Sequence, residues 1–147
     1  MLDPVQLFED IATVNGLKFF YGAKPFLNWE MTQTSLNGSE VFLALFPFDE
    51  PAVMDNGSVS SWSVSTIIWV GRKFDAPDAT FSSADETEAQ KYKRRLKDLR
   101  AYIDIILGDL CGDADIEVTE ARVFRELNKF DENTDVVGCE LTFVYAA

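Results

Sequence analysis

Histidine is absent from the 147 residues of this chain. Its absence removes the commonest general base, the commonest zinc ligand and the side chain that most often titrates near neutral pH. Cysteine occurs only at Cys111 and Cys139, too rarely for a disulfide scaffold, so we expect two reduced thiols that pack as small apolar side chains. No apolar run approaches the roughly 18 residues of a membrane span, and the sequence therefore predicts no contact with a membrane.

Positive charge is also scarce. The chain has 13 Lys and Arg against 25 Asp and Glu, a net charge of -12, which argues against a general affinity for nucleic acid or anionic lipid. The apolar fraction of 47% is large enough for one domain, residues 1–147, with its own core. The first residues lack a basic region followed by an apolar run, so we expect synthesis and folding in a cytoplasm.

No catalytic or cofactor motif is visible. The sequence has no glycine-rich phosphate loop, no Cys/His metal set and no nucleophile next to a base. Residues 131–135 begin like a calcium loop, but Val136 and Thr142 stand where an EF-hand requires glycine and glutamate. We therefore predict no catalytic residue, metal or cofactor, while an irregular cation site near Asp131–Asp135 and an enzyme using paired carboxylates stay open. A further acidic group should simply face water: Asp109, Asp113, Asp115 and Glu117.

Hydrophobic periodicity outlines the first half of the chain. Asp3-Pro4 predicts the start of a short amphipathic helix, and Asn15-Gly16 predicts its end. Strands are expected at residues 17–21, near 30–36, at 41–46 and at 59–70. Residues 47–58 contain two prolines and Asn56-Gly57, which predict a long protruding loop with a turn at the Asn-Gly pair.

The second half predicts a long helix and two strands. Ser83 and Glu86 form a candidate capping box for a helix from about Asp85 to Leu110, ended by Gly112. Its apolar stripe steps by three and four residues through Tyr92, Leu96, Leu99, Ile103, Ile106 and Leu110. Strands at residues 116–127 and 136–145 should follow, joined by a polar turn at 131–135.

This order predicts an α+β fold with a mainly antiparallel sheet, packed on one face by a short N-terminal helix and a long central helix. The strand at 41–46 is apolar on both of its faces, so both should be covered, one of them by another subunit. The predicted oligomer interface on this strand is Val41, Phe42, Leu43, Leu45 and Phe46.

Six of the 13 basic residues lie within residues 91–100. They are most simply the solvated face of the long helix. In a second interpretation, Lys93, Arg94 and Lys97 pair with an acidic face of a neighbouring subunit. Nucleic-acid binding has the least support, because no aromatic platform accompanies these cations.

The order of elements resembles that of tailed-phage tail-completion proteins, including the tail terminators. The segment Phe130–Gly138 with the strand after it is similar to the ending of small neck and tail proteins of phages and prophages from gut bacteria. The resemblance implies a non-enzymatic ring, commonly hexameric, that completes the tail tube or joins it to the head. The aromatic stretch at residues 26–29 departs from the pattern.

The resemblance also implies partners and a location. Tail tube and neck proteins would bind the ring, and DNA would pass through it without specific binding. The protein would be in the host cytoplasm during assembly and then in the virion neck or tail. The predicted contacts with an adjoining ring are Asp49, Glu50, Met54 and Asp55.

A function of another class stays open. Aromatic residues gather in the region Phe19–Trp29, where they would suit a ligand or peptide groove of a small cytoplasmic binding module. The residues concerned are Phe19, Phe20, Tyr21, Phe26 and Trp29.

Overall fold

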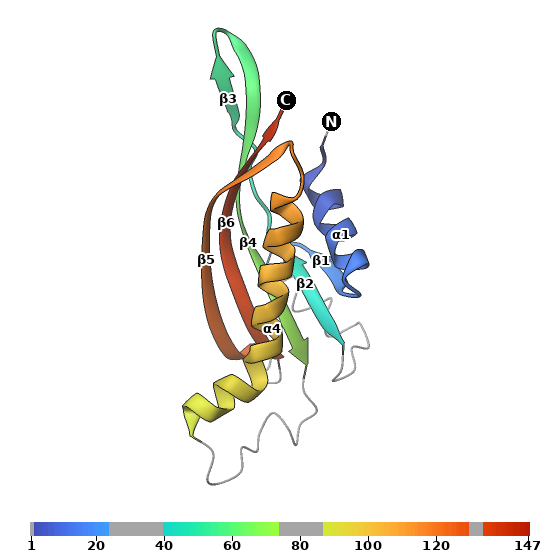
Figure 1. Ribbon diagram of the computed structural model, residues 1–147, viewed down its shortest axis with the longest axis vertical. Helices are drawn as coiled ribbons and strands as arrows, with labels where there is room; N and C mark the ends of the chain where they lie inside the picture. Colours follow the sequence, from blue (N-terminus) through green and yellow to red (C-terminus); the bar gives the residue numbers. More distant parts are fainter. Residues whose placement is uncertain (1, 24–39, 74–86, 130–133) are drawn as a thin grey trace.

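The computed structural model of the chain describes residues 2–23, 40–73, 87–129 and 134–147 (Figure 1). Over these residues it has an α+β fold in which a mixed six-stranded sheet carries two helices on one face. In chain order the elements are α1 (Pro4–Val14), β1 (Lys18–Tyr21), β2 (Val41–Leu45), β3 (Ala52–Asp55), β4 (Ser58–Lys73), α4 (Glu88–Cys111), β5 (Ile116–Lys129) and β6 (Thr134–Ala146).

The first helix forms as the sequence predicts. The Asp3 carboxylate accepts hydrogen bonds from the backbone N–H groups of Val5 (3.0 Å) and Gln6 (3.4 Å), and Pro4 occupies the first helical position. Asn15 ends the helix, and Gly16 follows in the left-handed region at a φ of 70°. The chain can therefore turn directly into β1.

The sheet has the order β1-β2-β4-β6-β5, with β3 attached to β4 alone. The pairing of β1 with β2 is parallel, and every other pairing is antiparallel. The predicted, mainly antiparallel sheet is thus confirmed. Its longest strand, β4, has 16 residues and pairs with β3 at one end and β2 at the other.

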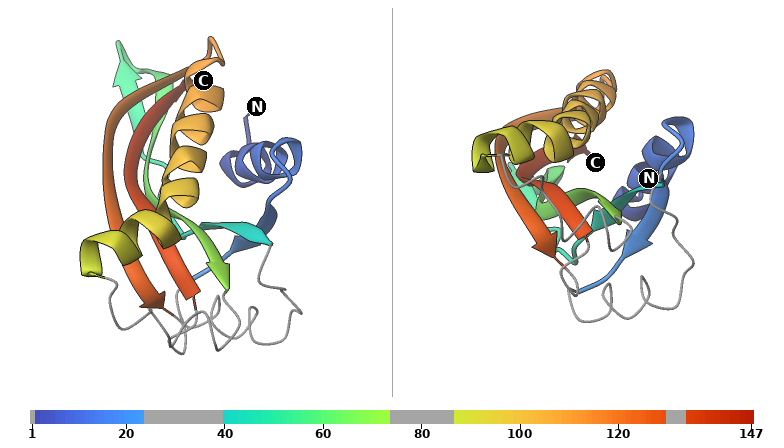
Figure 2. Two further views of the ribbon diagram at one scale, coloured as in Figure 1. Left: turned by 60° about the horizontal axis from the view of Figure 1, so that its bottom comes forward. Right: turned by 90° about the horizontal axis from the view of Figure 1, so that it is seen from below.

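The helices cover one face of this sheet (Figure 2). The described part of the predicted stripe on α4 is fully or almost fully buried: Leu96, Leu99, Ile103, Ile106 and Leu110. These side chains form one core with apolar residues of β4 and β6, and Phe8 of α1 meets Phe143 of β6 edge to face at 6.1 Å.

The start of α4 differs from the prediction. Thr87 is the N-cap, and its hydroxyl accepts from the Gln90 N–H at 3.2 Å while the Gln90 side chain accepts from the Thr87 N–H at 2.9 Å. Ser83 and Glu86 lie outside the described residues. Figure 1 shows α4 changing direction early, and the buried positions described along it begin at Leu96. Gly112 caps its end, as predicted.

The second face of the sheet is half aromatic and half polar. The aromatic half buries Phe20, Phe42 and Trp69 in a smaller cluster. Two rings lie across glycines on neighbouring strands, because Phe42 is the register partner of Gly71 and Phe124 that of Gly138. Toward β3 this face turns to serine and threonine.

The burial of β2 corrects the predicted oligomer interface. Phe42, Leu43 and Leu45 are each 0% exposed within the single chain, so the prediction of a subunit contact through them is wrong. Both faces of the strand are indeed covered, but within the chain's own fold. Val41 and Phe46 are half-buried, and their place in an interface stays a prediction.

The closing hairpin also differs in detail. Thr134 and Asp135 were expected in a polar turn, but both belong to β6 and are buried, with Asp135 in register with Arg72 of β4. Several other predictions lie outside the described residues: the strand at 30–36, the aromatic residues Phe26 and Trp29, and residues 131–133 of the predicted turn.

Candidate interaction surfaces

Residues 47–58 are not simply a loop, as was predicted, because they include a strand. Ala52–Asp55 forms β3, which pairs antiparallel with the first residues of β4. Asn56 and Gly57 make the connection at φ values of 50° and 80°. Two successive positive φ values suit a two-residue hairpin turn, for which Asn-Gly is the preferred pair. The turn was predicted correctly, and the strand before it was missed.

This hairpin projects from one end of the molecule (Figure 1). We call residues 51–60 the arm, and every one of them is exposed. Met54 is 59% exposed and Val53 41%, and Met54 is the cross-strand partner of Val59, which is 36% exposed. Apolar side chains are therefore displayed on an element that the described part of the chain leaves uncovered.

The arm and the two residues before it are acidic. Asp49, Glu50 and Asp55 are all exposed, and residues 49–60 contain no Lys or Arg. The predicted inter-ring residues, which are these three and Met54, thus lie on or beside the arm. A partner for this element would have to offer cations and some apolar surface.

A hydrogen bond ties the base of the arm to the sheet. The phenol of Tyr145, a buried side chain of β6, donates to Oε2 of Glu50. Burial, and then the Glu50 carboxylate, raise the pKa of Tyr145 to about 12. The backbone adds a bond from Ser63 N–H to the Pro51 carbonyl at 2.9 Å. The direction in which the arm leaves the sheet is therefore fixed at its root.

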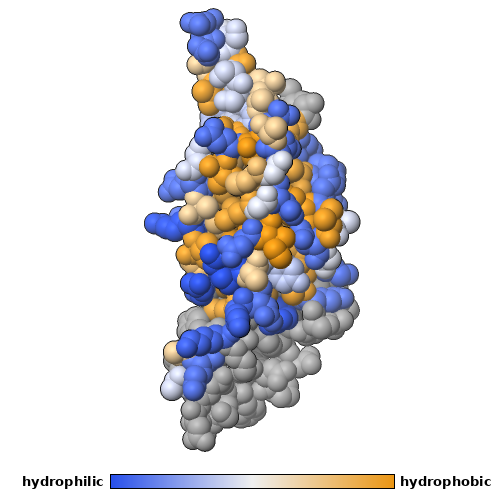
Figure 3. Space-filling view, in the orientation of Figure 1, coloured by the Kyte–Doolittle hydropathy of each residue, from blue (hydrophilic) through white to orange (hydrophobic). Residues whose placement is uncertain are grey.

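A second surface lies where α4 passes β5. A hollow of about 440 Å³ has, among the described residues that line it, four that are cationic and one that is apolar: Lys93, Leu96, Lys97, Arg100 and Arg125. We call it the basic hollow. Arg100 pairs with Asp104 on the next turn at 2.7 Å, whereas Lys93, Lys97 and Arg125 are exposed. Figure 3 shows strongly hydrophilic side chains over the lower half of α4, below an apolar area between the helices.

Two of the predicted basic interface residues, Lys93 and Lys97, thus line this hollow, and the side chain of Arg94 lies outside the described residues. The contributions of Arg100 and Arg125 were missed. Lys93, Lys97 and Arg100 follow helical spacing, so their common face could have been found from sequence. Arg125 required the register of β5, which pairs it with Val137 on the helix-covered face, where it lines the same hollow.

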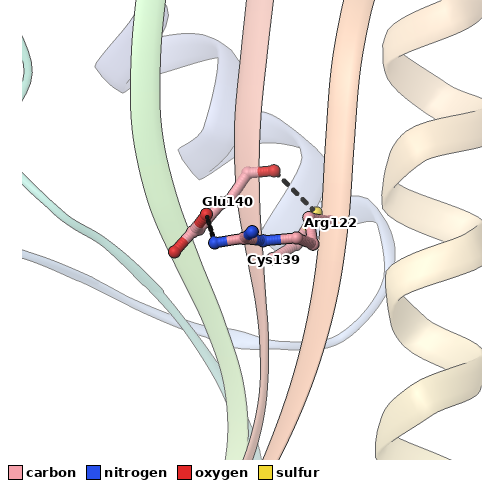
Figure 4. Close-up of polar contacts among 3 residues, drawn as sticks. All are labelled: Arg122, Cys139 and Glu140. Atoms are coloured by element: carbon pink, nitrogen blue, oxygen red, sulfur yellow. Dashed lines mark hydrogen bonds and ion pairs between the residues drawn. The ribbon is translucent and has the colours of Figure 1, made fainter.

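The two cysteines have different surroundings. Both thiols are free, but only Cys139 is buried, so the expectation of burial is wrong for Cys111. Burial raises the pKa of the Cys139 thiol, which lies 3.6 Å from the Glu140 carbonyl oxygen. On the other face of the sheet, Arg122 pairs with the Glu140 carboxylate at 2.7 Å (Figure 4). That ion pair is exposed and contributes little to stability.

Two of the acidic residues near the end of α4, Asp109 and Asp113, accept hydrogen bonds from neighbouring groups. Asp109 accepts a hydrogen bond from the Asn15 side chain at 2.9 Å, and Asp113 accepts from the Asp115 N–H at 2.9 Å. Within the described part of the chain, no group of three or more His, Cys, Asp or Glu side chains is placed to hold a metal ion. Among the helices described, none combines the length and apolar character needed to cross a membrane.

The aromatic region proposed for ligand binding is only partly described. Phe20 is buried, Phe19 is half-buried and Tyr21 is exposed. The described residues that line a hollow of about 410 Å³ on the second face are Ala23, Phe46, Pro47, Ser65, Thr66, Ile67 and Glu140. Phe19, Phe20 and Tyr21 do not line it.

Comparison with known proteins gives no match: no protein-family model fits the chain, and no curated protein is significantly similar to it.

Proposed function

We propose that this chain is a non-enzymatic structural subunit of a phage or prophage neck or tail. Its copies assemble into a ring that completes the tail tube or joins it to the head. The arm is the observation that carries the proposal, because residues 51–60 are all exposed and yet present Val53, Met54 and Val59. An ordered hairpin with apolar side chains in water is typical of a surface that another chain covers.

The order of elements supports the same function. A capped helix, a sheet with a projecting hairpin, a second helix on the same face and a closing pair of strands follow one another along the chain. That order is the one on which the resemblance to tail-completion proteins is based. Tail tube and neck proteins are accordingly the partners we propose.

Charge supports the passage of DNA without binding. The net charge of -12 would repel phosphates from much of the surface of such a ring. The basic residues of the hollow are local, and their neighbours Asp98 and Asp104 are exposed carboxylates on the same helix. We therefore propose that DNA moves through the ring without specific contacts.

Measuring the assembly state tests the proposal directly. The full chain would be followed by light scattering over the widest accessible range of concentration, and the largest species would be imaged by electron microscopy. We expect a closed ring of defined mass that grows in population with concentration. A monomer at every concentration would overturn the proposal.

A further inference from the structure

The arm and the basic hollow are complementary in charge. The arm with its two preceding residues carries three carboxylates and no cation; Asp55 is the carboxylate near its tip, and Glu50 is held at its root by Tyr145. Four of the described residues that line the hollow are cations. One of the four, Arg100, has an intrahelical partner in Asp104. Lys93, Lys97 and Arg125 remain as exposed cations around the hollow, in a chain whose net charge is strongly negative. Opposite charges of this kind guide association and select register.

The two surfaces also match in apolar character. Met54 and Val59 lie side by side as cross-strand partners just before and after the turn. Leu96 lies under the hollow but is only 1% exposed, so the apolar surface of the hollow comes from the aliphatic stems of the surrounding Lys and Arg side chains. A volume of about 440 Å³ lies within the range of sites that hold a small ligand or a few side chains.

One chain cannot join these surfaces to each other. Figure 1 shows the arm at one end of the long axis, while the first turns of α4, which carry Lys93, lie toward the other. The Tyr145–Glu50 hydrogen bond and the Pro51–Ser63 backbone bond hold the arm in that direction. Contact between the arm and the hollow therefore requires two copies of the chain.

We propose that the tip of the arm of one subunit docks in the basic hollow of the next. Asp55, at the end of β3, would pair with Lys97, and Met54 would pack against the stems of Lys97 and Arg125. This inference rests on the proposed ring, and it names the contact that would hold the ring together. Because the two patches differ, the contact is head-to-tail, which is the type that closes rings.

A charge swap between Asp55 and Lys97 tests this contact. Asp55→Lys and Lys97→Glu would each be measured alone and then combined in one chain, with dissociation constants from light scattering or mass photometry. We expect each single variant to weaken the assembly about tenfold or more, since each places like charges together. The combined variant should return to within about threefold of the natural chain, because the opposite pair is restored in reversed order.

Matched controls separate this contact from a general effect of net charge. Glu9→Lys on α1 and Lys18→Glu on β1 make the same changes at exposed positions away from both surfaces. We expect neither to change the dissociation constant by more than about twofold. Circular dichroism of each variant would establish that the fold is intact.

The outcomes distinguish this inference from the ring itself. A natural chain that stays monomeric overturns both. A ring that forms equally well with Asp55→Lys and Lys97→Glu overturns the contact and leaves the ring standing. Weakening by the single variants without recovery in the combined one also overturns the pairing.

Discussion

We call β1, β2, β5, β6 and residues 61–73 of β4 the body of the sheet. The body and the arm differ in what covers them. In the body, Leu43 and Phe143 face the helices and Phe42 faces the other side, and all three are 0% exposed. In the arm, ten consecutive residues are exposed although the backbone pairing continues from one region to the other. Strand β4 passes through both, so a single strand serves two purposes.

The difference separates two uses of apolar residues. Burying a large apolar side chain within the chain contributes about 1.5–3 kcal/mol to folding, so the body of the sheet stabilises the monomer. Met54 and Val59 contribute little of this kind while the chain is alone. Their apolar surface is available to a second chain, and substitutions in the two regions should therefore affect different measurements.

Truncating a buried side chain in the body should have the largest effect on the free energy of unfolding. Phe143 is fully buried and meets Phe8 edge to face. Phe143→Ala removes the ring and leaves a cavity between β6 and α1, so we expect the free energy of unfolding to fall by about 3–5 kcal/mol. Urea denaturation followed by circular dichroism measures the loss. A loss below about 1 kcal/mol would show that this core does not govern stability.

A substitution in the aromatic half of the second face should have the next largest effect on the free energy of unfolding. A Cβ added at Gly71 would lie 2.3 Å from Cζ of Phe42 and 2.9 Å from the Asp135 carbonyl oxygen. Because Phe42 is fully buried and the other neighbour is backbone, Gly71→Ala should cost about 2–3 kcal/mol of stability.

Gly138→Ala is the matched comparison for Gly71→Ala. Its added Cβ would lie 2.2 Å from Cζ of Phe124, but that ring is only half-buried and can move outward. We expect a loss about half as large, measured in the same urea series. Equal losses at the two glycines would contradict the argument that the mobility of the facing ring sets the cost.

A substitution at the root of the arm should have an intermediate effect on the free energy of unfolding. Tyr145→Phe removes the hydrogen bond to Glu50 and should lower the free energy of unfolding by about 1.5 kcal/mol. In the folded chain the pKa of Tyr145 is raised from 10.0 to about 12. The native state therefore holds this proton more tightly than the unfolded state, and the stabilisation is complete below pH 10 and lost as the pH rises toward 12.

Denaturation curves at pH 8, 10 and 11 test the titration. The natural chain should lose stability between the last two, and Tyr145→Phe should lose less over the same interval. An identical loss in both proteins would mean that Tyr145 does not couple ionisation to folding. Glu50→Gln, which keeps an acceptor but removes the charge, should lie between them.

The regular elements of the body were predictable because their signals are local. The Asp3-Pro4 cap, the stripe from Leu96 to Leu110 and the alternation along β4 each follow from the period of a helix or strand. The sequence could not show that β2 lies between β1 and β4, since strand order depends on long-range pairing. Without it, an apolar strand appeared to need a partner subunit.

The arm was harder to predict for a different reason. Pro47 and Pro51 both argue against a strand. In the structure, Pro51 immediately precedes β3, where its missing N–H interrupts no bond and its carbonyl accepts from Ser63. The basic hollow was half predictable, because its three α4 cations follow helical spacing while Arg125 joins them only through folding.

Substitutions at the tip of the arm should have the smallest effect on folding. Met54→Ser, at a side chain that is 59% exposed, should change the free energy of unfolding by less than about 0.5 kcal/mol. Assembly should respond instead, with a dissociation constant raised about fivefold or more, because the substitution removes the apolar part of the proposed contact between subunits. Ile105→Ser, at an exposed position of α4 away from the arm, is the control and should leave assembly unchanged. A Met54→Ser variant that unfolds more easily yet assembles normally would reverse the distinction between body and arm, since Met54 would then belong to the monomer's own core.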